Sequence, residues 1–355
     1  MNSVKANDSI ISLYYPPIQY DSCGNIIVID SSGNITGNDG TYYINDYYIY
    51  GSYNSCNMSG RNKNNVVGIY GLTYVISQGT RFIDFEIYNK NNEPIIATSS
   101  NPSNYYIKES DNYVLFKDAI DTIIKNAFSI MYSPNPNDPI FLHLRIKSTN
   151  HNMMTRIIDI LNPYRNQFLL GPKYNYEYQS CSVDNNNETV CKSKNLARVP
   201  LYFFQKKIIL MLDRSNTAAF EYSDLMELVN ITTDSMNCRL LTNHDMIYSP
   251  DQFELLEFNK LSMTIVTPDV GVKSENPSLQ SSMKLGIQID AIDFSNPDEN
   301  MKKAQETFNI QGFAFILKPP ELRFKPVIYN IPDDNPEGYS YAKRTLQGKG
   351  YSWNI

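Results

Sequence analysis

Two carboxylates alternate with apolar residues in one short stretch of this sequence. Asp84 and Glu86 lie within residues 81–87, Arg-Phe-Ile-Asp-Phe-Glu-Ile. In a β-strand alternate side chains share a face, so both acids would point to the side opposite the isoleucines. Two carboxylates that face a core or a cavity are costly unless a cation or a metal pairs with them. The stretch therefore predicts either a metal or acid–base site, or an edge strand whose acids face water.

The composition indicates a folded, mildly acidic protein. Of the 355 residues, 42% are hydrophobic and 19% are charged, so a large core is feasible and general disorder is not expected. The net charge of −6 argues against general binding to nucleic acids or anionic membranes. The start of the chain lacks the apolar run of a signal peptide, and no stretch is long enough to span a bilayer. We therefore expect a cytoplasmic protein, or a component of a particle assembled in a cell.

The cysteines and the residue bias say little about chemistry. The five cysteines form no CxxC pair, which argues against a structural zinc site. Cys181 and Cys191 flank a polar, Asn-rich loop and could pair if oxidised, although free thiols are expected in a reducing compartment. Asparagine and tyrosine are unusually frequent, with 27 tyrosines, and this bias suggests an AT-rich genome.

Strand-like runs alternate with helical stripes along most of the chain. Apolar residues recur at helical spacing over 115–128 and 152–161, and further helices are expected at 66–77 and 300–308. The strand-like runs are residues 81–87, 94–98, 139–145, 206–212, 261–266, 286–292 and 312–317. This alternation predicts a parallel α/β fold, and about eight strands over roughly 270 residues fit a closed TIM-type (β/α)8 barrel.

Both ends of the chain differ from this pattern. Residues 1–50 hold short apolar runs and the turn signal Asn38-Asp39-Gly40, which predicts an extended N-terminal arm with a β-hairpin. Residues 325–355 are polar and rich in Pro, Gly and Tyr, which predicts a C-terminal tail and not a packed element. The barrel is expected to occupy residues 51–324.

Six segments of the barrel region carry a family resemblance in their order and spacing. They are Gly51-Ser-Tyr-Asn-Ser55, Arg81-Phe-Ile-Asp-Phe-Glu86, Glu93-Pro-Ile-Ile-Ala-Thr98, Asp138-Pro-Ile-Phe-Leu-His-Leu-Arg145, Lys206-Lys-Ile-Ile-Leu210 and Gly312-Phe-Ala-Phe-Ile-Leu-Lys-Pro319. Together they resemble the catalytic barrel of the phosphoinositide-specific phospholipase C family. The resemblance covers an X half at 51–213, with an Asn-rich loop at 175–195, and a Y half at 255–324.

The resemblance implies the fold of that family without its chemistry. The family cleaves a phosphodiester with two histidines, and Tyr53 and Thr98 stand at the matching positions here. A phenol with a pKa of about 10 and an alcohol cannot transfer protons near neutral pH. The resemblance therefore implies that both proton-transfer groups are lost.

The family's calcium site is changed in a similar way. Its ligands are an asparagine and three acids, as oxygen coordination of a hard cation requires. Asn54, Asp84 and Glu86 match three of them, with the order of Asp and Glu exchanged, and Arg145 stands at the fourth position. A guanidinium there would replace the metal. We therefore expect Arg145 to pair with both acids, with no metal, cofactor or catalytic residue in the chain.

Other positions offer no replacement for the lost groups. The residues at the positions of the family's phosphate-binding cations are Met211, Asp213 and Met263. His143 lies in an apolar strand beside Arg145 and could face either the barrel interior or the helix layer. His151 and His244 are expected at the surface. The sequence thus predicts a pseudoenzyme.

Three functions fit such a chain. The first is a structural or assembly protein whose arm and tail order against partners. The composition suits a minor capsid protein or other virion component of a large DNA virus, with capsid proteins as partners and with peripheral lipid contact left open. The second is a module that binds a phosphoinositide or phosphate, for which Arg145 is the only clear cation in the barrel mouth. The third is an active, divergent phosphodiesterase, against which the missing histidines argue.

Overall fold

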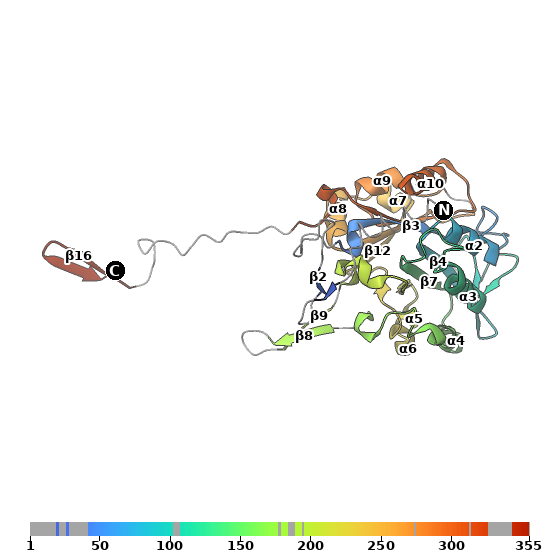
Figure 1. Ribbon diagram of the computed structural model, residues 1–355, viewed down its shortest axis with the longest axis horizontal. Helices are drawn as coiled ribbons and strands as arrows, with labels where there is room; N and C mark the ends of the chain where they lie inside the picture. The colour runs from blue at the N-terminus through green and yellow to red at the C-terminus, as the bar shows by residue number, and fades with distance from the viewer. Residues whose placement is uncertain are drawn as a thin grey trace. The chain divides into compact units, whose positions relative to one another are not determined.

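The computed structural model of the chain divides into two compact units, Met1–Arg323 and Phe324–Ile355 (Figure 1). The structure describes residues 19–20, 26–27, 42–101, 107–176, 179–183, 189–193, 195–272, 275–311, 314–325 and 343–354. The first unit holds the predicted barrel and the second holds a short hairpin.

Eight parallel strands of the first unit form a nearly closed α/β barrel. In spatial order they are β11 (Ile231–Thr232), β10 (Ile208–Leu212), β7 (Ile140–Ile146), β4 (Phe82–Lys90), β3 (Tyr47–Ser52), β14 (Ile289–Ile292), β13 (Met263–Thr267) and β12 (Cys238–Thr242). Each neighbouring pair in this order is parallel. The predicted parallel TIM-type barrel is confirmed.

The barrel remains open between β11 and β12. No ladder joins these two strands within the described part of the chain, which corrects the prediction of a fully closed barrel. Only residues 233–237 separate the two strands. A crossover between neighbouring parallel strands needs a dozen or more residues, so this connection is too short to bring β12 alongside β11 as a paired neighbour. The sequence had not predicted either strand.

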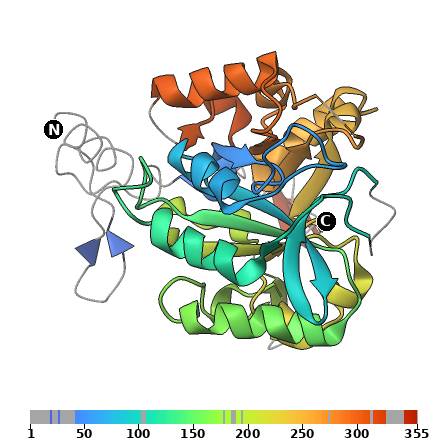
Figure 2. The same cartoon turned by 90° about the vertical axis from the view of Figure 1, so that its right-hand side faces the viewer.

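Helices cover the outside of the barrel, as Figure 2 shows. They are α2 (Ile69–Ser77), α3 (Phe116–Asn126), α4 (His151–Leu161), α5 (Thr217–Phe220), α6 (Ser223–Met226), α7 (Asn243–Ile247), α8 (Gln252–Leu261), α9 (Leu279–Lys284) and α10 (Glu299–Gln311). The four predicted helices correspond to α2, α3, α4 and α10. The side chain of Asn150 caps α4 by accepting a hydrogen bond from the backbone N–H of Met153 at 3.0 Å, which explains why that helix begins there.

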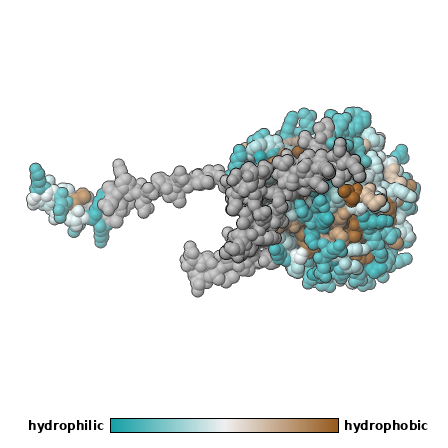
Figure 3. Space-filling view, viewed as in Figure 1, coloured by the Kyte–Doolittle hydropathy of each residue, from teal (hydrophilic) through white to brown (hydrophobic). Residues whose placement is uncertain are grey.

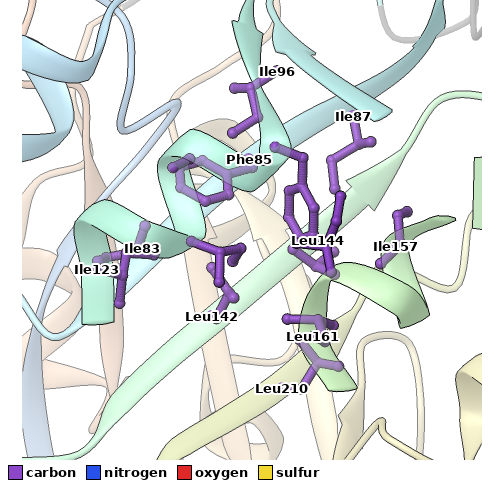
Figure 4. Close-up of a cluster of buried hydrophobic side chains, with 14 of the residues drawn as sticks. Ile83, Phe85, Ile87, Ile96, Ile123, Leu142, Leu144, Ile157, Leu161 and Leu210 are labelled. Atoms are coloured by element: carbon purple, nitrogen blue, oxygen red, sulfur yellow. The ribbon is translucent and has the colours of Figure 1, made fainter. Parts of the chain in front are cut away.

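Side-chain alternation in β4 and β7 separates two cores. The apolar residues Ile83, Phe85 and Ile87 point outward and pack with Leu142 and Leu144 against α3 and α4 (Figure 4). Inside the barrel a second apolar cluster includes Phe82, Phe141, Ile209, Met211, Met263, Ile265 and Ile289. The barrel interior is therefore mostly a packed apolar core.

Three shorter strands extend the sheet outside the barrel. β5 (Glu93–Ala97) pairs antiparallel with β4, and β6 (Val114–Leu115) pairs with β5. β15 (Phe315–Leu317) was expected as a barrel strand, but it pairs antiparallel with β3. The barrel already contains eight parallel strands. β15 instead pairs with the part of β3 that precedes the ladder between β3 and β4.

Two boundaries differ from the sequence prediction. β3 begins at Tyr47 and is fully buried, so the barrel starts inside the segment assigned to the N-terminal arm. Of that arm, β1 (Gln19–Tyr20) and β2 (Ile26–Ile27) form an antiparallel pair, whereas the predicted turn at 38–40 lies outside the described residues. The C-terminal segment holds a hairpin of β16 (Thr345–Gly348) and β17 (Tyr351–Asn354), where the sequence predicted only a tail.

The described part of the chain also contains a separate two-stranded sheet and six 3-10 helices. β8 (Gln179–Val183) and β9 (Thr189–Ser193) form an antiparallel pair in which Cys181 and Cys191 are opposite each other in register. The 3-10 helices are Ile44–Asp46, Asn162–Tyr164, Pro172–Tyr174, Leu196–Arg198, Leu201–Phe204 and Pro320–Leu322.

The face in Figure 3 is mostly hydrophilic, with a group of hydrophobic residues among the polar ones. Among the described helices, none combines the length and the apolar character needed to cross a bilayer.

Candidate functional site

The residues singled out in the sequence meet where β3, β4 and β7 end. Tyr53 and Asn54 directly follow β3, Asp84 and Glu86 lie on β4, and Arg145 lies on β7. The parallel ladder places Glu86 opposite Arg145. Because directly paired residues of adjacent strands share a face, the guanidinium and both carboxylates lie on the same side of the sheet.

Arg145 uses every N–H donor of its guanidinium. Nε donates to Asp84 Oδ1 at 2.9 Å, and Nη2 donates to Asp84 Oδ2 at 2.6 Å. Nη1 donates to Glu86 Oε1 at 2.5 Å and to the Tyr53 hydroxyl at 3.3 Å. The remaining Nη2 donor reaches Asn54 Oδ1 at 2.7 Å. These contacts account for all five donors, and the expected pairing of Arg145 with both acids is present.

The two carboxylates have further partners besides Arg145. Asp84 Oδ2 accepts from the backbone N–H of Asn54 at 3.0 Å. Glu86 Oε2 accepts from the Tyr88 hydroxyl and from the backbone N–H of Ser99, each at 3.0 Å. Every carboxylate oxygen of the pair is therefore engaged, which is what makes buried charges tolerable.

Burial and charge together fix the protonation states of this cluster. Asp84 is fully buried, and Arg145 is 7% exposed. Burial alone would raise the pKa of Asp84, but the charge of Arg145 and the hydrogen bonds from His143 and Arg145 hold it well below its ordinary value. Burial would lower the pKa of Arg145, yet Asp84 foremost keeps it well above the ordinary value. The cluster is thus a permanent ion pair near neutral pH.

This arrangement does not fit a calcium ion. Asn54 Oδ1, both Asp84 oxygens and Glu86 Oε1 are the oxygens that would coordinate a hard cation, and each accepts a hydrogen bond from Arg145. The guanidinium therefore occupies the place of the metal. Elsewhere in the described residues, no group of three His, Cys, Asp or Glu side chains is arranged to hold a metal ion.

Tyr53 packs its ring on the same guanidinium. The Arg145 Cζ lies 4.5 Å from the ring centroid, a cation–π contact in addition to the hydrogen bond. Burial raises the pKa of the Tyr53 phenol above its ordinary value, which Arg145 offsets only in part. The phenol is thus still less able than a free tyrosine to transfer a proton near neutral pH.

Thr98, the other position of interest, is sequestered in a hydrogen-bond network. Its hydroxyl contacts Asn65 Oδ1 at 2.8 Å and the backbone carbonyl of Asn62 at 3.2 Å. Only 1% of the residue is exposed. Thr98 therefore anchors the loop that follows β3 and faces away from solvent.

His143 is a polar group that the sequence left unassigned. Its Nδ1 lies 2.9 Å from Asp84 Oδ1, its ring stacks on Phe82, and its Nε2 has no partner. The side chain faces the barrel interior, which alternation could have predicted, because His143 and Arg145 are two residues apart on one strand. It is fully buried, so no substrate in the mouth can reach it. His151 and His244 are exposed, as expected.

A loop that the sequence did not single out covers the cluster. Within residues 57–65, Asn62 donates its backbone N–H to Val272 at 3.0 Å and its Nδ2 to Gly271 at 3.2 Å. Asn62 Oδ1 accepts from Asn54 Nδ2 at 3.3 Å. The segment after β3 thus reaches the loop after β13 across the barrel mouth. Asparagine is so frequent in this chain that the sequence gave no reason to choose Asn62.

None of the three residues at the positions matched to phosphate-binding cations carries a positive charge. Met211 and Met263 are fully buried in the barrel interior. The Asp213 carboxylate accepts hydrogen bonds from the backbone N–H and the hydroxyl of Ser215, at 2.9 and 2.8 Å. These three residues stabilise the fold locally and do not form an anion site.

Comparison with known proteins supports the fold. No protein-family model matches the sequence, and no curated protein matches it. Among solved structures, PLC21 of S. officinalis and PLC21 of L. pealei each have a TM-score of 0.62 at 18% identity, over 83% of this chain and 40% of theirs. A calcium-dependent phosphoinositol-specific phospholipase C from a Gram-negative Pseudomonas sp. has a TM-score of 0.50 at 10% identity, over 78% of this chain and 95% of its own. This chain has the fold of the phospholipase C-like phosphodiesterases, and it spans less than half the length of the two PLC21 chains.

Proposed function

We propose that this chain is a non-catalytic phospholipase C-like barrel that acts as a structural or assembly protein. The observation that carries the proposal is the saturation of Arg145, whose five donors bind Asp84, Glu86, Asn54 and Tyr53. The guanidinium of Arg145 takes the place that the family resemblance assigns to a calcium ion. Such a site stabilises a scaffold and leaves nothing for a reacting phosphate.

Acid–base chemistry is the first requirement that the site fails to meet. Phosphodiester cleavage by this fold needs groups that exchange protons near neutral pH. Tyr53 and Thr98 do not, and the one histidine in the cluster, His143, is fully buried. An active, divergent phosphodiesterase is therefore the least supported of the three functions.

Phosphate binding is the second requirement. An anion in the mouth would compete with two carboxylates for the donors of Arg145 and would have to displace Asn62, which is 4% exposed. Both changes would leave buried groups unpaired, at about 1–3 kcal/mol or more for each group. The alternative of a phosphoinositide-binding module is accordingly weaker than the scaffold function.

A turnover assay tests the proposal directly. Purified protein is incubated with phosphatidylinositol vesicles, with calcium or with a chelator, and released inositol phosphate is measured. We expect no release above the protein-free control, and the same melting temperature in calcium and in chelator. Calcium-dependent release by the unmodified chain would overturn the proposal.

A restored site provides the matched control. Arg145→Glu returns an oxygen ligand to the position of the guanidinium, next to Asn54, Asp84 and Glu86. We expect calcium to raise the melting temperature of Arg145→Glu but not that of Arg145→Gln, since the glutamine variant lacks the third carboxylate. Calorimetric titration with a soluble inositol phosphate separates the phosphate-binding alternative, for which saturable heat from the unmodified chain would be required.

We further propose which kind of assembly the protein joins. The composition, rich in Asn and Tyr, favours a minor capsid protein or other virion component with capsid proteins as partners. Fractionation of the native source tests this part. Co-migration with capsid proteins in a large particle is expected, whereas a free monomer in the native source would contradict it.

A further inference from the structure

The C-terminal hairpin has one strongly apolar face. β16 and β17 pair so that Leu346 is opposite Trp353 and Gly348 is opposite Tyr351. The Tyr351 and Trp353 rings stack at 5.0 Å and are 63% and 46% exposed. A two-stranded hairpin is at best marginally stable alone in water, and a stacked aromatic pair is the kind of anchor that protein interfaces use. We therefore expect another protein surface to cover this face.

The charge of the hairpin indicates what kind of surface would cover its apolar face. Residues 343–354 contain Lys343, Arg344 and Lys349 and no acid, a formal charge of +3. The whole chain carries −6, so the other residues carry −9. A basic, aromatic hairpin on an otherwise acidic protein is complementary in charge to other copies of the same protein.

A surface pocket in the first unit has the matching properties. The pocket has a volume of about 280 Å³, and Leu241, Pro250, Leu255 and Tyr248 contribute apolar or aromatic surface to it. Tyr248 is 70% exposed at the C-terminal end of α7. The volume suits one aromatic side chain, and an exposed aromatic residue on its wall could stack on an incoming ring.

One exposed carboxylate, Asp245, lines the same pocket together with Arg239 and His244, and further acids follow in the sequence. Residues 243–261 contain four acids and one lysine. Glu254 is paired with Arg239 at 2.7 Å and Glu257 with Lys260 at 2.6 Å. The exposed Asp245 and Asp251 therefore carry the charge that these ion pairs leave uncompensated, in a position to attract a basic partner.

We propose that the hairpin of one copy docks on a second copy, with Trp353 in the pocket beside α7. The inference rests on the assembly function proposed above and names one of its partners. The two surfaces differ, so the contact is heterologous: each copy offers one hairpin and one pocket, and association proceeds head to tail into a ring or a filament.

The chain provides its own reporter for this contact. Trp353 is the single tryptophan, so its fluorescence reports on the hairpin alone. Sedimentation equilibrium over a range of protein concentrations should show a rising mass, with a parallel shift of Trp353 emission to shorter wavelength. Raised ionic strength should weaken the association, because opposite charges steer and hold it.

Two variants separate the two halves of the contact. Trp353→Ala removes the anchor and leaves the pocket, whereas Tyr248→Lys blocks the pocket with a like charge and leaves the hairpin. Each should weaken self-association by about tenfold or more, as loss of an interface anchor does. Mixed together, they should form a 1:1 pair that grows no further. Ile130→Lys, at a residue that is 66% exposed and does not line the pocket, is the matched control and should associate normally.

Three results would overturn the inference. The unmodified protein could stay monomeric at every concentration, the two variants could associate as well as the unmodified protein, or their mixture could fail to pair. Emission from Trp353 that is already shifted in a dilute monomer would place the hairpin on its own chain and would also refute docking between copies. None of these results bears on the turnover assay, so the lack of catalysis and the docking contact are tested separately.

Discussion

At the mouth of the barrel, each buried charged residue is stabilised by the opposite charge of its partner. Removal of one member of a buried ion pair costs about 3–5 kcal/mol, because the remaining charge has lost its partner. We therefore expect Arg145→Ala to lower the free energy of unfolding by this amount at pH 7, measured by urea denaturation. The triple variant Asp84→Asn, Glu86→Gln, Arg145→Met removes all three charges together and should recover most of the loss. An unchanged melting temperature for Arg145→Ala at neutral pH would contradict the ion-pair assignment.

A second residue makes the stability depend on pH. Burial raises the pKa of Asp290 to about 7, which a hydrogen bond from Ser282 only partly offsets, and its Oδ1 has no partner. The folded-state pKa lies above the ordinary value of 3.8, so this carboxyl takes up a proton on folding. Its contribution is complete below about pH 4 and is lost as the pH rises through about 7. Asp290→Asn should therefore flatten the decline in unfolding free energy between about pH 4 and about pH 7.

The Asp290 comparison isolates one group among several. Burial also raises the pKa of Asp138, to about 6, with the same direction of effect. It lowers the pKa of Lys318 to about 7, which acts in the opposite direction. Both groups are unchanged in Asp290→Asn, so the difference between the two pH profiles belongs to Asp290. Parallel profiles would show that this carboxyl is ionised in the fold.

The sequence could predict part of the site at this scale. The pairing of Arg145 with Asp84 and Glu86 was implied by the family resemblance, which places Arg145 at the fourth ligand position, together with the cost of buried charge. The register that lets Arg145 bind both oxygens of Asp84 could not be predicted, because it depends on how β7 is aligned with β4. The covering Asn62 was also beyond reach, since its role arises from backbone contacts across the mouth and not from any local pattern.

Elements differ in how many neighbours stabilise them. β4 and β7 each have a parallel partner on both sides, whereas β11 and β12 each pair on one side only within the described sheet. Hydrogen exchange followed by mass spectrometry should therefore show slow exchange in β4, β7 and β10 and faster exchange in β11 and β12. β10 is the internal control, because it lies next to β11 and has both partners. Equal protection of β10 and β11 would mean that the seam is closed in solution.

The elements that the sequence predicted share a physical signature. α3 and α4 have continuous apolar stripes, and β4, β7 and β10 are apolar runs flanked by turns. α8 was not predicted because only Leu255 and Asn259 of this helix are buried, so its sequence has little periodicity. β11 was not predicted because two residues carry no pattern. Tertiary packing decides such short elements.

At the scale of the whole molecule, the order of many weak signals predicted the barrel although no single segment did. The hairpin in the C-terminal segment was not predicted, because its four-residue strands, joined at Lys349 and Gly350, are polar on one face. Composition predicted neither the pocket beside α7 nor its charge match with the hairpin. The residues that line the pocket fall within 239–255, but its shape depends on how β12, α7 and α8 pack together.

The place of β3 in the sheet makes it depend on partners that are synthesised much later. β4 pairs with one edge of this strand only at Gly51 and Ser52; β15 covers the rest of that edge, with Phe315 opposite Ile49, and β14 pairs with the other edge, with Ile289 opposite Ile49. A ribosome makes β14 and β15 long after β3. Until then most of both edges of this apolar, tyrosine-rich strand stay unpaired, and such edges recruit other chains. We therefore expect a product that stops before residue 289 to aggregate more readily than one that includes β14 and β15.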